Sequence, residues 1–388
     1  DWSSDVCSSD LMAEPQVDSL ESYQREWQKK GEENVSEDML GGIKWKDEEA
    51  LKAQRVIIWN FAKKMGKNLF SGHDLTKIPL PIQLFEPESF LQRLAKQYMF
   101  AHKYLTAASQ ATDPVERLQH VMVWWVAGMN LMGEQFRKPF NPILGETYQC
   151  IYEDGSMGFF EQSSHHPPIS CWEVSGQEGA YTYAGWGELT AQFRGNSVKA
   201  LQTGTQNVYF PDGGHITFTL PTVWVTGMAW GDRVIKYCGE MNFSDASNEL
   251  SCTLTLNPKD KKGLFFSKHV STPDFMRGEI LKKDGKKQKK VSVCEGSWLS
   301  ELAFDGKVLW TLAENDGVKA PVPASDPLPS DSQFREDLQF TGQGDLTRGG
   351  EWKVLLEEKQ RYDVKLRKNA KEAHKRMKDR AMAKSTLA

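Results

Sequence analysis

The spacing of hydrophobic and polar residues changes several times along this chain. Residues 12–46 are polar, rich in Glu and Gln, and show no apolar repeat, so we expect a mostly disordered tail. In LKAQRVIIWNFAKKMGKNLF, the residues Ile57, Ile58 and Phe61 fall on one helical face while lysines fall on another. This pattern predicts an amphipathic helix that ends near Gly66. Such a helix could pack on the core, lie on a membrane surface, or close over a pocket.

Two longer helices are predicted within residues 86–132. The first, EPESFLQRLAKQYMFAHKYLTAAS, opens with acidic residues, which are favourable at the N-terminus of a helix. The second, TDPVERLQHVMVWWVAGMNLMGE, opens with Asp113 as its capping residue and Pro114 at the first helical position. Leu118 and Val121 begin an apolar series with helical spacing, so we expect this second helix to be largely buried.

From residue 144 to 315 the apolar period becomes two, which is typical of strands. TYQCIY and SMGFFEQ flank the turn sequence EDG, while QNVYF and HITFTL flank PDGG, so both pairs should form hairpins. Because many short strands follow one another without helices, we expect an antiparallel sheet or barrel. The lysine-rich segment 281–290, LKKDGKKQKK, should be an exposed loop, with contact to a membrane surface as the alternative.

The chain returns to a helical pattern at residues 350–385. From Lys353 to Ala388 it holds twelve Lys or Arg and five Asp or Glu, a local excess of +7. This basic helix requires an anionic partner, or it is a solvated end of the chain.

Composition narrows the class of protein. Residues 1–11, DWSSDVCSSDL, resemble the translation of a sequencing-adaptor oligonucleotide and precede a start at Met12, so we set them aside. Without their three aspartates the net charge of −4 becomes −1, which predicts no general affinity for nucleic acid or anionic membranes. The other five cysteines lack CxxC spacing, which favours a reduced, cytosolic protein. We expect no transmembrane segment and no secretion, because the sequence has no long apolar run and no leader.

The most unusual motif is FFEQSSHHPPIS, in which two histidines meet two prolines. A proline has no N–H to donate to a strand ladder, so the strand should end or bulge at Pro167, leaving His165 and His166 at its end. Adjacent residues of an extended chain point to opposite faces, and no other Cys or His cluster completes a metal site, so we expect no metal. No nucleophile motif accompanies the pair. A core or capping role for both rings stays open.

Two further segments offer groups that suit a phosphate. FRKPFNPILGETYQ places Lys138 and Asn141 around a proline-bounded turn that opens a strand. Lys353, Glu357 and Arg361 are spaced four residues apart on one side of the terminal helix. A phosphomonoester carries nearly two negative charges at neutral pH, so a buried one needs compensating cations. Each segment taken singly also fits an ordinary turn or a solvated charge stripe.

KPFNPILGETY and EQSSHHPPIS, in this order along the chain, resemble the two hallmark motifs of the oxysterol-binding protein family. The resemblance continues through SGHDLTKIPLPIQLFEPESFLQR, LPSDSQFRED and EEKQR, and it is closest to the short, single-domain members of plants and algae. It implies a mainly β (α+β) fold, with a large, nearly closed antiparallel barrel enclosing a lipid tunnel. The lid would comprise residues 47–75, and residues 76–388 would form the barrel domain with its helices.

The resemblance also implies a head-group site for phosphatidylinositol 4-phosphate. By motif, the residues around its phosphates would be Lys138, Asn141, His165, His166, Lys353, Glu357 and Arg361. The lid would contribute Asp74, Leu75 and Thr76 to the same head group, and Trp59 would cover the acyl chains or the sterol.

The function implied is exchange of phosphatidylinositol 4-phosphate for a sterol between membranes, without a cofactor and without catalysis. The alternatives are exchange with phosphatidylserine in place of the sterol, or a sterol sensor that signals by lid closure without net transport. A phosphoinositide hydrolase would need a nucleophile that the motifs lack. We expect a cytoplasmic monomer that contacts organelle membranes transiently.

Overall fold

The computed structural model describes residues 42–65, 75, 78–133, 136–258 and 274–385. Of the predicted disordered tail, residues 12–41 lie outside this range. The prediction is wrong for its last residues, because Ile43 and Lys44 form strand β1 and pair with Ile235 and Val234. Ile43 is buried, and the adjacent Trp45 stacks on an aromatic ring with centroids 5.3 Å apart. Burial of these two side chains fixes the end of the segment to the sheet.

Sixteen strands of the described chain form one antiparallel sheet, as the alternating pattern predicted. The strands that follow β1 in this sheet are β4 Thr147–Ile151, β5 Met157–His165, β6 Pro168–Ser175, β7 Thr182–Arg194, β8 Ser197–Thr203, β9 Gln206–Tyr209, β10 His215–Phe218, β11 Thr222–Thr226, β12 Val234–Asp245, β13 Leu250–Leu256, β14 Phe275–Asp284, β15 Lys287–Ser297, β16 Glu301–Phe304, β17 Lys307–Thr311 and β18 Val322–Pro323. Both predicted hairpins, β4–β5 and β9–β10, are confirmed.

Two of the strand positions in the middle of this sheet are each filled by two strands that lie in line. β9 and β8 pair with the first and second half of β7 in one continuous register. β10 and β11 likewise lie in line, between β9 and β8 on one side and β12 on the other. The sheet therefore runs in one antiparallel order to the edge strands β17 and β18, which do not pair with each other in the described chain. The expected barrel is confirmed as nearly closed.

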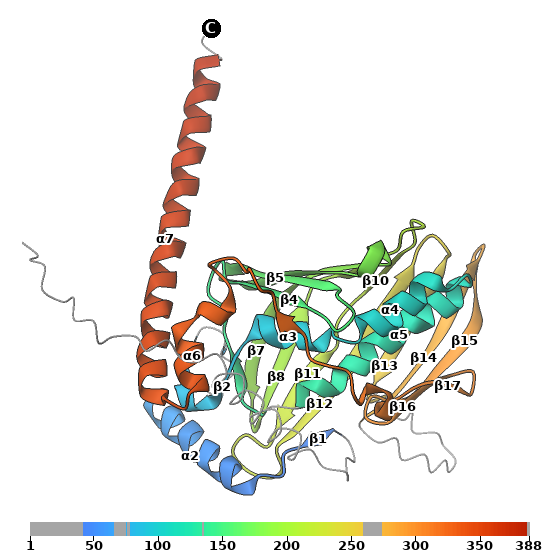
Figure 1. The fold of residues 1–388 in the computed structure, drawn as a ribbon, viewed down its shortest axis with the longest axis horizontal. Coiled ribbons are helices and arrows are strands. Elements are labelled where there is room, and N and C mark those ends of the chain that lie inside the picture. The colour runs from blue at the N-terminus through green and yellow to red at the C-terminus, as the bar shows by residue number, and fades with distance from the viewer. Residues whose placement is uncertain (1–41, 66–74, 76–77, 134–135, 259–273, 386–388) are drawn as a thin grey trace, which may run out of the picture.

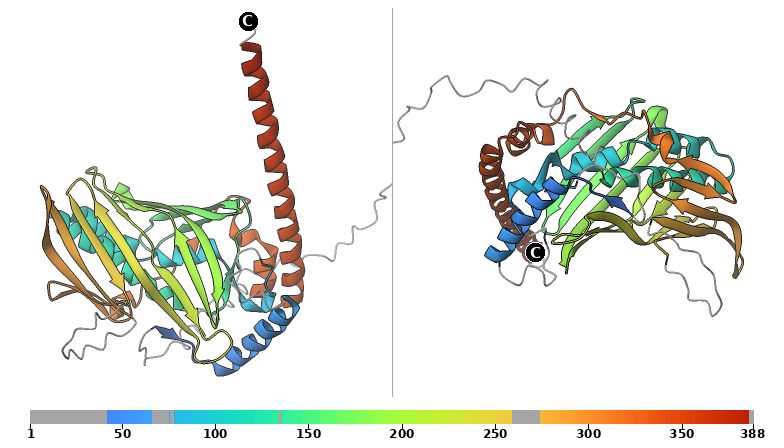
Figure 2. Two further views of the ribbon diagram at one scale, coloured as in Figure 1. Left: turned by 180° about the vertical axis from the view of Figure 1, so that it is seen from behind. Right: turned by 90° about the horizontal axis from the view of Figure 1, so that it is seen from below.

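Three helices pack against the curved sheet (Figures 1 and 2). They are α3 Phe90–Gln97, α4 Ala101–Gln110 and α5 Pro114–Met129. The apolar side of α5 is fully buried in the main core, as predicted, and Asp113 caps the helix by accepting a hydrogen bond from the Val115 N–H. A second, two-stranded parallel sheet joins β2 Phe85–Ser89 to β3 Lys138–Phe140.

The first predicted helix differs from the structure at its start and in its middle. Residues 86–89 are the strand β2 and not a helix, because Ser89 is the capping residue and Gln92 completes its capping box. The helix also breaks at Tyr98, whose buried ring packs against Tyr183 with centroids 4.9 Å apart. The lysine-rich segment 281–290 is a β14–β15 hairpin and not a loop, with Gly285 at a φ of +61° in its turn.

The C-terminal part holds two helices, α6 Glu336–Gly342 and α7 Leu346–Ser385. The terminal helix starts four residues before the predicted residue 350, and its far half extends away from the body (Figure 1). The helix α2 Glu48–Met65 reaches the last described residue before Gly66, so its predicted end near Gly66 lies at the limit of the described residues. Short 3₁₀ turns connect several elements: η3 Ile82–Leu84, η4 Asn130–Gly133, η5 Gln177–Gly179, η6 Leu312–Asn315 and η7 Ser332–Phe334.

The chain passes from β8 to β9 in line and close to β7, and a single substitution can test how tightly this junction is packed. Gly204 has a φ of +125°, and an added Cβ would lie 2.0 Å from the carbonyl oxygen of Trp186. Gly204→Ala should therefore lower the free energy of unfolding by about 3 kcal/mol or more. Gly195 has a φ of +61° and open space around its Cα, so Gly195→Ala should cost only about 1–2 kcal/mol. Urea unfolding of both variants measures the difference, and equal losses would contradict a tightly packed junction.

Candidate functional site

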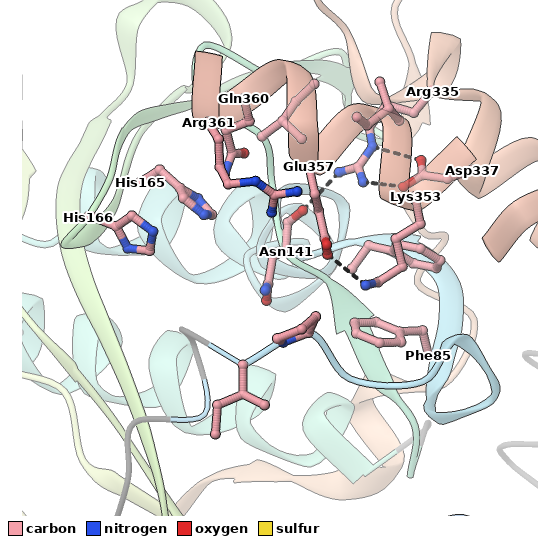
Figure 3. A pocket seen from close by; sticks show the side chains of 15 residues that line it. Phe85, Asn141, His165, His166, Arg335, Asp337, Lys353, Glu357, Gln360 and Arg361 are labelled. Carbon is pink, nitrogen blue, oxygen red and sulfur yellow. Dashed lines mark hydrogen bonds and ion pairs between the residues drawn. The ribbon is translucent and has the colours of Figure 1, made fainter. Parts of the chain in front are cut away.

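Two adjoining hollows lie beside strands β7, β8 and β11 and the turns near them. The first is an apolar cavity of about 280 Å³, walled by Ala191, Phe193, Val198, Val223 and Val225 from strands β7, β8 and β11. The second is a polar pocket of about 180 Å³ (Figure 3). Asn141 and His165 line both. A molecule with a charged head and a hydrocarbon tail therefore finds both environments within one continuous site.

The pocket brings together most of the residues that the motifs predicted. Asn141, His165, His166, Lys353, Glu357 and Arg361 all line it. Lys138 lines the adjoining apolar cavity, and its ammonium donates a hydrogen bond to the side-chain oxygen of Asn141. In Figure 3 the two histidines lie on one side of Asn141 and Glu357 and Lys353 on the other, with Arg361 between these two groups.

The histidines occupy the turn between β5 and β6. β5 ends at His165 and β6 begins at Pro168, so the strand ends before Pro167, as predicted. The expectation that the rings point to opposite faces is wrong, because this turn brings their centroids to 4.5 Å. Nδ1 of His165 is buried and has no hydrogen-bond partner. This nitrogen is therefore free for a ligand.

His165 is a weak base in this pocket. Burial, and next the proximity of His166, lower its pKa to about 4, against the opposing effect of the Glu357 carboxylate. The His165 ring is therefore uncharged at neutral pH. A bound phosphate would supply the negative charge that favours its protonated form.

The first turns of α7 supply cations to the opposite wall. Lys353 is only 7% exposed, and its ammonium is 2.6 Å from a carboxylate oxygen of Glu357. The Phe85 ring lies beneath two ammonium groups, with its centroid 5.2 Å from Nζ of Lys353 and 5.1 Å from Nζ of Lys138. Gln360 anchors the helix, because its side-chain oxygen accepts the Leu144 N–H at 3.2 Å.

The pKa of Lys138 reflects the burial and the neighbouring positive charge in this site. Burial is the largest cause that lowers its pKa, and the charge of Lys353 is the next, so the pKa falls to about 7. Glu86 and Glu357 oppose this shift without cancelling it. The site thus holds its cations in a position where a buried anion would stabilise them.

Arg335 was missed as a site residue by the sequence reasoning. Its guanidinium lies 2.6 Å from Glu146 and 2.7 Å from Asp337, and all three side chains are buried. It also donates to the main-chain carbonyl of Asn141 at 3.0 Å. The two carboxylates outweigh burial and raise its pKa above the ordinary value. The segment LPSDSQFRED, which holds Arg335, entered the sequence reasoning only as part of the resemblance. Its residue spacing gives no sign that Arg335 pairs with a carboxylate almost two hundred residues earlier in the chain.

The lid residues agree with the prediction only in part. Ile58 and Phe61 of α2 and the isolated Leu75 line the apolar cavity, whereas Asp74 and Thr76 lie outside the described residues. The prediction that Trp59 covers the cavity is wrong: it is 56% exposed, because it follows Ile58 by one residue and so points about 100° away.

Comparison with known proteins identifies the family. The family model described as oxysterol-binding protein matches residues 57–322, more than half of the chain. Oxysterol-binding protein 9 of Dictyostelium discoideum is 38% identical over 341 residues, which cover 84% of this chain and 79% of that protein. The chain belongs to the oxysterol-binding protein family. Its members bind lipids and are not enzymes, so this protein is a lipid-binding protein without catalytic activity.

Other family members share the sequence or the fold to a lesser degree. Oxysterol-binding protein-related protein 3C of Arabidopsis thaliana is 28% identical, covering 87% of this chain and 74% of the relative. The mouse oxysterol-binding protein-related protein 6 is 30% identical, but the chain spans about a third of its length. Two crystal structures share the fold: the Osh3 ORD in complex with PI(4)P from Saccharomyces cerevisiae, and the Osh1 ORD domain in complex with cholesterol. Their TM-scores are 0.64 and 0.67 at 22% and 21% identity, covering 80% and 92% of this chain and 84% and 90% of theirs.

The described residues lack two kinds of feature, a membrane-spanning helix and a metal-binding cluster. No helix within the described ranges is long and apolar enough to cross a membrane. No group of three or more His, Cys, Asp or Glu in the same residues could hold a metal ion.

The lowered pKa of Lys138 predicts that the stability of the protein depends on pH. Because its pKa falls from 10.5 to about 7 on folding, the unfolded chain binds more protons between these values, and stability increases with pH across that window. Lys138→Met should therefore unfold with a free energy higher by about 1–4 kcal/mol at pH 7, and this gain should shrink towards pH 10. Denaturant unfolding at several pH values tests this, with the exposed Lys289→Met as the control. A destabilised Lys138→Met protein at pH 7 would contradict the shift.

Proposed function

We propose that this protein transfers lipids: it binds phosphatidylinositol 4-phosphate with the head group in the polar pocket, and exchanges it for a sterol between membranes. The observation that carries the proposal is the continuity of a cation-lined pocket with an apolar cavity, through the shared residues Asn141 and His165. We infer further that the protein acts as a cytoplasmic monomer that contacts organelle membranes only transiently.

The head-group assignment is supported by charge. A phosphomonoester brings nearly two negative charges, and Lys138, Lys353 and Arg361 can compensate them at short range. The unpartnered Nδ1 of His165 offers one further group for a phosphate oxygen. On this proposal, ligand binding raises the depressed pKa of Lys138, so the ammonium stays protonated in the complex.

The sterol assignment is supported by the cavity wall. Strands β7, β8 and β11 contribute small and branched apolar side chains, which stabilise hydrocarbon at about 25 cal/mol per Å² removed from water. Two proteins of similar fold were crystallised with these lipid classes, one with PI(4)P and one with cholesterol. Phosphatidylserine is the alternative second lipid, and binding without transport is the alternative activity.

A liposome assay separates these alternatives. Donor vesicles carry a fluorescent sterol and acceptor vesicles carry phosphatidylinositol 4-phosphate, and transfer is followed in both directions. Acceleration of both flows, with sterol moving against its gradient when phosphoinositide moves down its own, supports exchange. Binding of sterol without faster equilibration would favour the sensor, and transfer of serine lipid alone would favour the other exchanger.

The histidine pair gives the sharpest test of the head-group assignment. Replacing His165 and His166 together by Ala removes two polar contacts to the phosphate, each worth roughly 1.5–3 kcal/mol when charge-assisted, so phosphoinositide affinity should fall at least about a hundredfold. Sterol binding should survive, because a sterol has no phosphate. Both affinities and the melting temperature are measured on one preparation. Parallel loss of all three would mean that the rings only stabilise the fold.

A second test addresses the cations of α7. Lys353→Ala and Arg361→Ala should each weaken binding of a short-chain phosphatidylinositol 4-phosphate in solution by at least about tenfold, because a buried phosphate loses a compensating charge. Lys371→Ala and Lys378→Ala, on the same helix beyond the pocket, are the matched controls and should leave this affinity unchanged. Calorimetry without vesicles keeps membrane attraction out of the measurement. Equal losses in all four variants would refute a specific pocket.

A further inference from the structure

The far half of α7 has no role in the pocket. Arg361 is the last helix residue that lines it. One and a half turns later, Nη2 of Arg367 lies 3.5 Å from the position of a Cβ added at Gly145, so the helix still borders the body there. Residues 368–379 are exposed on every side, and Figures 1 and 2 show this part of α7 leaving the body.

This segment carries a concentrated positive charge. Residues 362–385, which we name the α7 extension, hold nine Lys or Arg and three Asp or Glu, a net charge of +6. Two of the acidic side chains already have partners on the helix, because Lys359 pairs with Asp363 and Arg376 pairs with Glu372. A helix with so much uncompensated charge in water attracts an anionic surface.

The extension also has an apolar stripe. Its members follow one another at intervals of four, four, three and four residues, which keeps them on one face of a helix: Tyr362, Leu366, Ala370, Ala373 and Met377. The three large side chains of this stripe are 61%, 48% and 68% exposed in chain order. Lys365, Arg367 and Arg376 flank the stripe on its two sides, about 80–100° from its centre by helical rotation. A narrow apolar face with basic residues around it is typical of helices that lie on a lipid surface.

We propose that the α7 extension is a membrane-docking helix, which places its apolar stripe among lipid head groups and its basic residues against the phosphates of an anionic bilayer. Charge complementarity selects this occupant over a second copy of the chain, because pairing two such helices would bring two charges of +6 together. The same helix carries Lys353 and Arg361 into the pocket. Docking therefore holds the pocket at a fixed distance from the bilayer, whichever lipid it binds.

Binding to vesicles without any phosphoinositide tests this separately from the proposed transfer function. The full chain is sedimented with phosphatidylcholine vesicles, with and without phosphatidylserine. We expect binding that requires phosphatidylserine and weakens with salt. The triple variant Lys365→Glu, Arg367→Glu, Arg376→Glu should bind at least about tenfold more weakly, since each basic residue near an anionic surface contributes roughly a factor of five. Leu366→Gln with Met377→Gln should weaken binding at least about fivefold without changing the net charge.

A matched control variant carries the same change of net charge at a distant place on the surface. Lys283, Lys287 and Lys289 are exposed on the β14–β15 hairpin, at the other end of the molecule from α7. Reversing these three lysines should leave vesicle binding within about twofold of the unchanged chain, because their distance exceeds the screening length. Equal losses from the hairpin and α7 variants would overturn the proposal in favour of general attraction. Vesicle binding unaffected by both α7 variants would overturn it too, as would a dimer in solution that the α7 variants dissociate.

Discussion

The candidate site depends on the buried ion pairs of Arg335. Its guanidinium bonds two buried carboxylates and the main chain of Asn141, so residues near 140 and residues near 335 are joined at one point. Burying such charges is costly unless every partner is in place, and their mutual satisfaction fixes the geometry. The turn that holds Asn141 and the helix α7 that follows α6 therefore meet in one arrangement. Without this junction, the cations of α7 would have no defined position relative to the histidines.

The cations around this junction are of two kinds, those paired with carboxylates within the protein and those that are poorly compensated. Arg335 is neutralised within the protein, whereas Lys138 bonds only neutral oxygens and has its pKa lowered to about 7. Fully paired charges hold the structure, and the poorly compensated ones are the groups that an incoming anion can stabilise. This division explains why a pocket with several carboxylates can still favour a phosphate.

The amino-acid sequence predicted the sheet, its hairpins and the start of α5, because period, turn residues and caps are local signals. It failed where long-range packing decides. Residues 86–89 look helical from their charges, yet Glu86 pairs with Arg93 in a buried ion pair and the segment forms a strand. Trp59 was placed over the cavity by the family resemblance, whereas the apolar spacing of α2 had pointed to Ile58 and Phe61, which do line it. Arg335 stayed hidden because its partners are distant in the chain.

The wall of the apolar cavity also sets a mechanical limit. Strands β7, β8 and β11 each pair with a neighbouring strand on both edges, so they cannot spread apart without breaking ladder hydrogen bonds. The wall is therefore stiff, and the width of the cavity is set by the size of inward side chains such as Ala191 and Phe193. A change in the bulk of the bound molecule thus calls for the exchange of a few side chains, while the backbone stays as it is.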